Sequence, residues 1–410
     1  MIEARARAGG RVLTVRESFA HRQHAEAGAD LIDESQAEIC TLIGEMGLRR
    51  VPILSGGFTG IRQVGRSRRI SGRKGWIELQ RRLAPEVRSF CLGEQRWDGA
   101  VAEALGRESV AQWLDRVRAP KPLRTMAIGL RGFFLADPEA LSLLALVDQF
   151  AEEGTPGRDK IFRILGGNDR LPAALARALK GKLRLGTVLH AVRQSNTGIV
   201  ATVDTAGSLE QLSADYLICA TPASTLRDVT FDPSLPDGQR DAIRNLRYGA
   251  ATKTALQFER APWRRRGKPR AYGTNLPIGA VWDGNEEQQG RGGILTLLAG
   301  GAASAETQQM LEAGGPDRIV RELTWLDVRR TRLLAWHTLS WETDPWARGG
   351  YAFFDPAYKP AARLLLARPF GRVFFAGEHT SLKWQGYMNG AIETGLRASD
   401  EVTAQARMFP

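Results

Sequence analysis

The segment that most constrains the fold lies near the carboxyl end, where residues 373–402 read VFFAGEHTSLKWQGYMNGAIETGLRASDEV. Its first four residues are all apolar and predict a short strand, Val373–Ala376, buried on both faces. Gly377 and a polar loop follow, and the stretch after Gly386 predicts an amphipathic helix. Ligands of open α/β sheets lie beyond the carboxyl ends of the strands, where a helix amino terminus offers free N–H groups to an anionic or electron-accepting group. The segment therefore predicts an α/β protein with a ligand at this turn.

Strands and helices alternate along the rest of the chain as well. Apolar residues at helical spacing predict helices at 31–48, 142–154 and 171–183. The first helix is expected to stop near Gly47, and Asp169 is a candidate amino-terminal cap for the third. Runs rich in β-branched or aromatic residues predict strands, which lie at Thr187–Val192, Ile199–Val203, Tyr216–Ala220, and within 252–263 and 332–346.

Length and residue types exclude several classes of protein. A chain of 410 residues predicts about two domains. Its 3 cysteines and 5 histidines are scattered, which argues against a disulfide framework and against a metal site. No apolar run approaches the roughly 20 residues that span a bilayer, and the chain begins without a basic and then apolar leader. We therefore expect a cytoplasmic protein with no membrane span.

The formal net charge of +12 is concentrated in two basic runs, at 65–76 and 263–270. A basic surface can bind nucleic acid, an acidic membrane or an acidic substrate. These runs lack interleaved aromatic residues and any nucleic-acid motif, so arginine-rich, solvated surface loops are the favoured interpretation. We expect no nucleic-acid partner.

Five ordered segments carry a resemblance to a known family. The segment 374–395, FFAGEHTSLKWQGYMNGAIETG, resembles without a gap the carboxyl-terminal FAD signature of the flavin-containing amine oxidases, the monoamine-oxidase-like group. Four other segments resemble motifs of this family in the family's order: IEARARAGGR (2–11), GGNDRLPAALARAL (166–179), RYGAATKTALQF (247–258) and DPWARGGYAF (344–353). The resemblance thus covers nearly the whole chain.

The resemblance implies an α/β fold in which a Rossmann-like FAD-binding domain is interleaved with a mixed α+β substrate domain. The FAD-binding domain would take residues 1–55, 160–240 and 345–410. The substrate-binding domain would take residues 56–159 and 241–344.

Relatives in this family begin with a strand, a G-x-G-x-x-G turn and a helix, which together precede the acidic residue matched here by Glu3. That unit is roughly 30 residues long and cradles the pyrophosphate of FAD. The chain as given starts after it. We expect a start codon assigned too late, in preference to a true truncation or a split gene.

The resemblance implies FAD as the cofactor and assigns residues to its adenosine end. Glu3 would bind the ribose hydroxyls. Gly10 would belong to the cofactor site, and Arg11 would lie near the pyrophosphate, to which a guanidinium offers paired donors. Val188 would contact the adenine through its backbone. Without the resemblance, Arg11 would be a solvated arginine and Val188 a core valine.

At the flavin end, Gly377 would allow a close backbone approach and Glu378 would meet the ribityl chain or the phosphates. Trp384 would pack near the flavin or line the pocket. The Met388 N–H, at the start of the last helix, would face the flavin's pyrimidine oxygen. Gly350 stands where some relatives carry the cysteine that bonds to FAD, so we expect non-covalent FAD.

Three residues are the candidates for the chemistry. Lys253 stands in an apolar strand, where a lysine is costly without a partner. By resemblance it would hold a water at flavin N5. Tyr351 and Tyr387 match two tyrosines that flank the amine in front of the flavin, and aromatic faces suit an amine. Without the resemblance, Lys253 would be an exposed edge-strand lysine and the tyrosines would be packing residues.

The resemblance implies oxidation of an amine to an imine, which hydrolyses to an aldehyde or keto product and ammonia, while O₂ is reduced to H₂O₂. Small amines and O₂ would be the partners, and a homo-oligomer stays open. Two alternatives also stay open. One is a related flavoprotein acting on an amino acid, an isoprenoid or a porphyrinogen. The other is a non-catalytic relative that holds no FAD.

Overall fold

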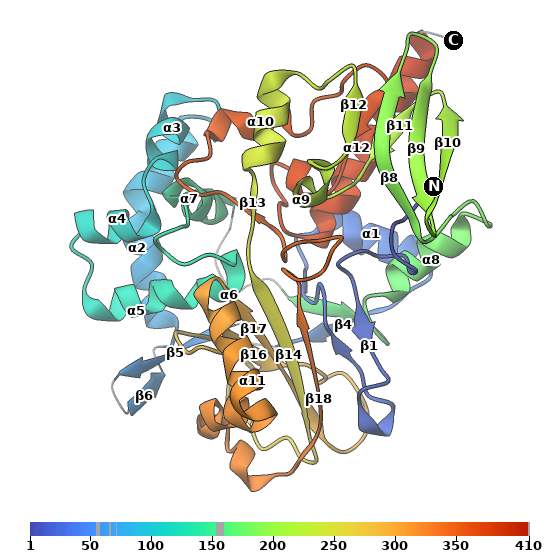
Figure 1. The fold of residues 1–410 in the computed structure, drawn as a ribbon. Helices are drawn as coiled ribbons and strands as arrows, with labels where there is room; N and C mark the ends of the chain where they lie inside the picture. Colours follow the sequence, from blue (N-terminus) through green and yellow to red (C-terminus); the bar gives the residue numbers. More distant parts are fainter. Residues whose placement is uncertain (55–57, 65–66, 71, 153–159, 409–410) are drawn as a thin grey trace.

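The computed structural model describes residues 1–54, 58–64, 67–70, 72–152 and 160–408. They form an α/β protein with two regions (Figure 1): a large sheet with α11 fills the lower part, and smaller sheets with most of the helices fill the upper part. No described helix is long and apolar enough to cross a membrane.

The lower region is built on a 7-stranded sheet in which β14 is the second strand from one edge. Strand β5 pairs with β15 in parallel, and the other neighbours are antiparallel. In sheet order the strands are β18 (Leu333–Ser340), β14 (Ala251–Phe258), β17 (Gly293–Gly300), β16 (Ala280–Asp283), β15 (Ala271–Thr274), β5 (Phe58–Val64) and β6 (Ser67–Ile70). All eight residues of β14 are buried, because β18 and β17 flank it and α11 (Ala302–Glu322) packs on it.

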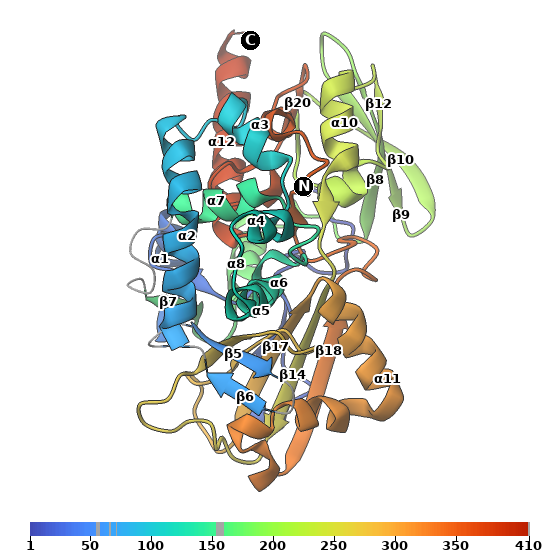
Figure 2. The same cartoon turned by 90° about the vertical axis from the view of Figure 1, so that its left-hand side faces the viewer.

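Helices α2 to α7 gather above the β5–β6 end of this sheet (Figure 2). Their bounds are Gly72–Leu92, Ala100–Gly106, Val110–Arg116, Lys121–Gly129, Arg131–Phe134 and Leu143–Glu152. Ser109 begins α4 with a capping box, since its hydroxyl accepts from the Gln112 N–H at 3.1 Å and the Gln112 side chain accepts from the Ser109 N–H at 2.8 Å.

The upper region combines short sheets with the remaining helices. Strands β10 (Ser208–Ala214), β9 (Ile199–Thr205), β8 (Thr187–Gln194) and β12 (Thr230–Asp232) form one sheet. Strand β11 (Leu217–Cys219) pairs in parallel with β20 (Val373–Phe375). Strands β3 (Ile32–Asp33), β7 (Ile161–Ile164) and β4 (Arg50–Ile53) form a third sheet, and β13 (Arg247–Tyr248) pairs with β19 (Ala352–Phe353). The pair β1 (Thr14–Val15) with β2 (Ala25–Glu26) lies beside the large sheet, where β2 contacts β17.

The upper helices are α1 (Ala37–Glu45), α8 (Arg170–Ala178), α9 (Ala223–Leu226), α10 (Asp237–Asn245) and α12 (Met388–Met408). Five short 3₁₀ helices occur across the described chain, at Ala20–Arg22, Thr324–Leu326, Val328–Arg330, Pro360–Leu365 and Glu378–Thr380.

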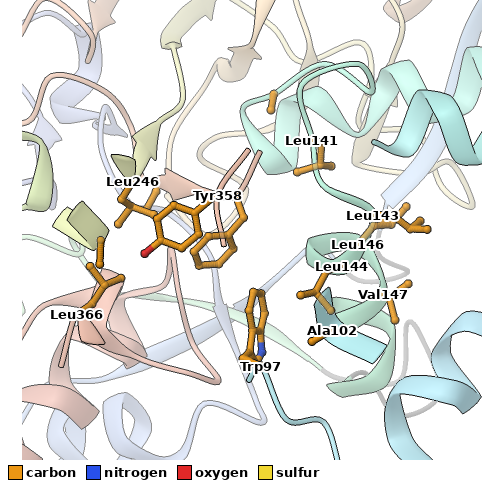
Figure 3. Close-up of a cluster of buried hydrophobic side chains, with 14 of the residues drawn as sticks. Trp97, Ala102, Leu141, Leu143, Leu144, Leu146, Val147, Leu246, Tyr358 and Leu366 are labelled. Carbon is orange, nitrogen blue, oxygen red and sulfur yellow. The ribbon is translucent and has the colours of Figure 1, made fainter. Parts of the chain in front are cut away.

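One buried cluster joins helices α2 to α7, here called the helical layer, to the rest of the upper region. Figure 3 shows Trp97, Leu144 and Val147 on the helical side close to Tyr358 and Leu366 from the carboxyl-terminal part. The cluster also contains Phe375 of β20. Segments far apart in the sequence therefore share one core, as an interleaved chain requires.

Two local expectations are wrong in detail. The helix expected at 31–48 begins only at Ala37, because Ile32 and Asp33 pair with β7 as strand β3. Asp169 does not cap α8; its carboxylate instead forms an ion pair with Arg16 at 2.7 Å. Both differences come from partners more than 100 residues away in the chain.

The two basic runs differ in what the structure describes. In the run 263–270, Arg264 pairs with Asp283 at 2.7 Å and Arg265 pairs with Asp327. Arginines of this run therefore neutralise acidic neighbours of the same chain, in agreement with the solvated-loop interpretation. The side chains of the other run, 65–76, lie outside the described residues.

Candidate functional site

A cavity of ≈ 2260 Å³ runs between the two regions. This volume exceeds the range of about 300–1,000 Å³ that holds a drug-sized ligand, so the cavity has room for a large cofactor and a substrate together. All 11 residues selected from the sequence line it. They are Glu3, Gly10, Arg11, Val188, Lys253, Tyr351, Gly377, Glu378, Trp384, Tyr387 and Met388.

Glu3 and Val188 lie together at one end of this cavity. The Glu3 N–H donates to Arg184 O at 2.9 Å and its C=O accepts from the Thr187 N–H at 2.9 Å, which places Glu3 beside the start of β8. The Glu3 carboxylate accepts from the Arg5 N–H at 2.8 Å and still borders the cavity. Gly10 has a φ of 54°, and a Cβ added there would meet no atom within 4 Å, so its backbone faces open space.

Arg11 and Glu378 form a buried link across the cavity wall. Arg11 Nη1 donates to Glu378 Oε1 at 2.9 Å and to Gly350 O at 2.8 Å, while Glu378 Oε2 accepts from the Gly386 N–H at 2.7 Å. Burial lowers the pKa of Arg11, but its interactions with Glu378, Tyr248 and Asp344 together outweigh burial and raise the pKa. The guanidinium is therefore charged at every working pH.

The start of α12 is held tightly against the loop that precedes it. Gly377, with a φ of 110°, donates its N–H to Thr394 Oγ1 at 3.0 Å. A Cβ added at Gly390 would lie 2.1 Å from Trp384 O, so loop and helix touch backbone to backbone. Met388 is the first residue of the helix, and its N–H is among those that a helix leaves without an internal acceptor.

Two tyrosines lie beside this loop. A Cβ at Gly386 would lie 3.2 Å from the Tyr351 ring, and the following residue, Tyr387, packs edge-on against Trp384 with ring centroids 5.8 Å apart. Tyr351 is fixed by a hydrogen bond from its hydroxyl to Phe133 O at 2.5 Å. Burial raises the pKa of Tyr351 well above its usual value, and Tyr387 adds to the rise, so the phenol stays neutral.

Lys253 is buried in β14, the second strand of the sheet, so the alternative of an exposed edge-strand lysine is wrong. Its Nζ donates to Gly28 O at 2.8 Å and to Asp30 Oδ2 at 3.0 Å. Burial lowers the pKa of Lys253, and the Asp30 carboxylate counteracts this shift.

Sequence reasoning missed the charged groups around Lys253. Asp30, Glu26 and Arg163 are all buried, and Arg163 pairs with Asp30 at 2.5 Å and with Glu287 at 3.0 Å. One signal was available: Arg163 stands between apolar residues in the short strand IFRI, where an arginine needs an acidic partner. The sequence does not say which acidic residue that is.

Glu26 makes the stability of the fold depend on pH. Burial raises its pKa to about 8, and Asp30 adds to the rise. The folded protein thus keeps a proton up to pH about 8 that the unfolded chain releases near the ordinary value of 4.5. The stabilisation from this proton is complete below pH 4.5 and is lost as the pH rises toward 8.

We therefore expect the free energy of unfolding to fall between pH 5.5 and 8, by at most about 1.4 kcal/mol per pH unit from this group. Glu26→Gln should flatten the dependence, while Glu17→Gln, at an exposed glutamate, should leave it unchanged. Urea unfolding at several pH values measures both. An identical slope in Glu26→Gln and the wild type would contradict the assignment.

The residues at this cavity fit a flavin dinucleotide. A helix amino terminus borders the cavity, backbone is open at Gly10, and Arg11 contributes a fixed positive charge on the same wall. Aromatic side chains and a buried ammonium group line the same space. The helix amino terminus and Arg11 suit anionic phosphates, and the aromatic side chains and the ammonium group suit a redox-active ring.

Comparisons with known proteins agree with this fit. The family model of flavin-containing amine oxidoreductases matches residues 1–403. The chain is 25% identical to the L-amino acid oxidase Bs29 of Bothriechis schlegelii, over 63% of this chain and 53% of that protein, so it spans about half the length of this relative. It is also 25% identical to the putative flavin-containing monoamine oxidase AofH of Mycobacterium tuberculosis (strain ATCC 25618 / H37Rv), over 98% of this chain and 91% of that protein.

Solved structures share the fold. Cyclohexylamine oxidase from Brevibacterium oxydans IH-35A superposes with a TM-score of 0.86 at 21% identity, covering 99% of this chain and 93% of that one. Putrescine oxidase bound to putrescine gives 0.84 at 20% identity, covering 98% and 93%. The match of the family model over residues 1–403 shows that the chain belongs to the flavin-containing amine oxidoreductases.

Proposed function

We propose that this protein is an FAD-dependent amine oxidase that converts an amine to an imine and reduces O₂ to H₂O₂. The observation that carries the proposal is the convergence of Tyr351, Tyr387 and the buried Lys253 on one cavity. When bound, the flavin takes the two electrons of the amine and passes them to O₂. The imine then hydrolyses to an aldehyde or keto product and ammonia.

The cofactor would be held without a covalent bond. Glu3 and Val188 would meet the adenosine, Gly10 and Arg11 the phosphates, and the start of α12 at Met388 the flavin ring. In this proposal, residues 1–55, 160–240 and 345–410 form the FAD-binding domain, and 56–159 and 241–344 form the substrate-binding domain. The limits near 55 and 159 fall outside the described residues.

The side chains would do the remaining work. Tyr351 cannot ionise at working pH, so with Tyr387 it would present neutral aromatic faces that orient an amine. Two of the three N–H groups of Lys253 donate to the protein. The third would hold a proton or a water beside the reacting centre. Trp384 would close the wall beside Tyr387 and keep bulk water out.

The substrate would lack an α-carboxylate. Arginine is the cation best suited to the carboxylate of an amino acid, because it offers paired donors, and every arginine that lines the cavity already has an acidic partner. These pairs are Arg5–Asp344 at 2.6 Å, Arg11–Glu378 at 2.9 Å, Arg348–Asp228 at 2.6 Å and Arg363–Asp148 at 3.2 Å. Binding a carboxylate would break one of them, which favours amines over amino acids.

The test starts from the protein incubated with FAD and desalted. Retained flavin absorbance separates an enzyme from a relative that holds no FAD, and acid precipitation should leave the colour in the supernatant. Peroxide release is then measured with 2-phenylethylamine and L-phenylalanine, which share a skeleton and differ by the carboxylate. We expect the amine to be oxidised at least about tenfold more efficiently, because freeing Arg5, Arg11 or Arg363 would break a largely buried ion pair at a cost of over about 1 kcal/mol. Preference for the amino acid would overturn the choice of substrate.

A further inference from the structure

Lys253 and Asp30 form a buried ion pair in the cavity wall between segments 223 residues apart in sequence. Lys253 Nζ and Asp30 Oδ2 lie 3.0 Å apart, and each side chain is 5% exposed. Asp30 stands in the connection between β2 and β3, whereas Lys253 is the third residue of β14. A buried charge is costly unless it is paired, and Asp30 is the carboxylate that is bonded to Lys253.

Asp30 is itself fixed from further directions. Its Oδ2 accepts from Trp282 Nε1 at 2.9 Å, and its Oδ1 accepts from Arg163 Nε at 2.5 Å. Arg163 is anchored in turn by Glu287 at 3.0 Å and by Asp283 O at 3.2 Å. Donors from β7, β14 and β16 thus hold the carboxylate in one orientation.

The same contacts fix the ammonium group. Two of its three N–H donors go to Gly28 O and Asp30, and the Trp282 ring centroid lies 5.1 Å from Nζ. The third N–H has no acceptor among the described residues, and Lys253 lines the cavity. Trp282 binds both members of the pair, the carboxylate through its N–H and the ammonium through its ring.

The charges around Lys253 depend on Asp30. Burial lowers the pKa of Lys253, Asp30 and then Glu26 raise it, and Arg163 lowers it. Glu26 is protonated below about pH 8 and contributes little charge there. Glu287 is engaged with Arg163. Without Asp30, the ammonium would be buried next to a second cation, with no carboxylate bonded to it.

We propose that Asp30 is a positioning residue: it keeps Lys253 charged and turned so that one N–H remains directed at the cavity, where the amine and the flavin would meet. The inference rests on the proposed function for its effect on turnover. The pairing itself rests on the contacts alone. Asp30 touches neither the substrate nor the cofactor in this proposal and acts through Lys253.

The test uses Asp30→Asn, which keeps the size of the side chain and removes its charge. In protein labelled with ¹³C-lysine, the Lys253 Cε signal is assigned by its loss in Lys253→Met and is titrated with pH in FAD-loaded protein. We expect the pKa of Lys253 to be lower in Asp30→Asn than in the wild type, and kcat to lose about tenfold or more, with the largest loss at high pH. Asp115→Asn, at an exposed aspartate of α4, is the matched control.

Two outcomes would overturn the proposal. One is an unchanged pKa of Lys253 in folded Asp30→Asn. The other is a double variant, Asp30→Asn with Lys253→Met, that is slower than Lys253→Met by the full factor of Asp30→Asn, because a residue acting through Lys253 has no effect in its absence. If Asp30→Asn does not fold, Asp30→Glu retains the charge but moves it, and must also change the Lys253 titration. A wild type that oxidises no amine contradicts the proposed function, while the Lys253 titration still tests the pairing.

Discussion

Lys253→Met is expected to lower amine turnover about a hundredfold or more while the protein keeps its flavin. Methionine fills a similar volume in β14 but removes the side-chain N–H that the bonds to Gly28 and Asp30 leave for the cavity. Loss of a positioned proton donor or water-holding group costs about 10²–10⁴-fold in rate. Asp30 keeps Arg163 and Trp282 as partners in this variant, so the fold should tolerate the change.

The measurement is kcat and KM for the best amine, together with flavin absorbance per protein. Lys182→Met, at an exposed lysine after α8, is the control and should behave as the wild type. Normal turnover in Lys253→Met would remove this residue from the chemistry. Loss of flavin along with activity would instead make Lys253 a residue of the cofactor site.

Gly390→Ala is expected to abolish flavin retention and to destabilise the fold by about 3 kcal/mol. The added Cβ would lie 2.1 Å from Trp384 O, a backbone atom that cannot rotate away. The loop before α12 is also tied to Ser381, whose hydroxyl accepts from the Trp384 N–H at 2.8 Å. Loop and helix must therefore separate, which displaces Met388 and Tyr387 at the cavity wall.

Gly44→Ala, in helix α1, provides a matched control. A Cβ there meets no atom within 4 Å and Gly44 does not line the cavity, so this variant should keep its flavin and gain up to about 1 kcal/mol from helix propensity. Thermal unfolding and the ratio of flavin to protein absorbance after desalting measure both variants. Equal flavin content in Gly390→Ala and the wild type would show that the contact between loop and helix is not needed for binding.

Local sequence was enough to predict the carboxyl-terminal part of the site. Val373–Phe375 form β20 and the last helix begins at Met388, because the apolar strand, the glycines and the helical spacing all lie within one short segment. The resemblance to the amine oxidases then selected residues from several distant segments. The structure brings all 11 of them to one cavity.

Contacts between distant segments could not be predicted in this way. Residues 31–36 continue the helical spacing of α1, yet Ile32 and Asp33 pair with β7, about 130 residues later. No feature of the sequence near Asp30 marks it, because its role depends on its ion pairs with Lys253 and Arg163, which lie on two different sheets. Asp169, expected to cap α8, instead forms an ion pair with Arg16. In each case a partner remote in sequence outweighs the local preference.

The core shared by helices α2 to α7 and strand β20 ties cofactor affinity to helix α4, none of whose residues lines the cavity. A ligand that binds only the folded chain adds its binding free energy to the stability of the whole cooperative unit. Reciprocally, a substitution that loosens the packing of Trp113, which is fully buried in α4, lowers the free energy of unfolding of the same cooperative unit. Mutations that reshape the cavity from helices α2 to α7 will therefore change the flavin concentration that the protein needs in order to stay folded. Variants that unfold at a low flavin concentration can be kept folded by excess flavin.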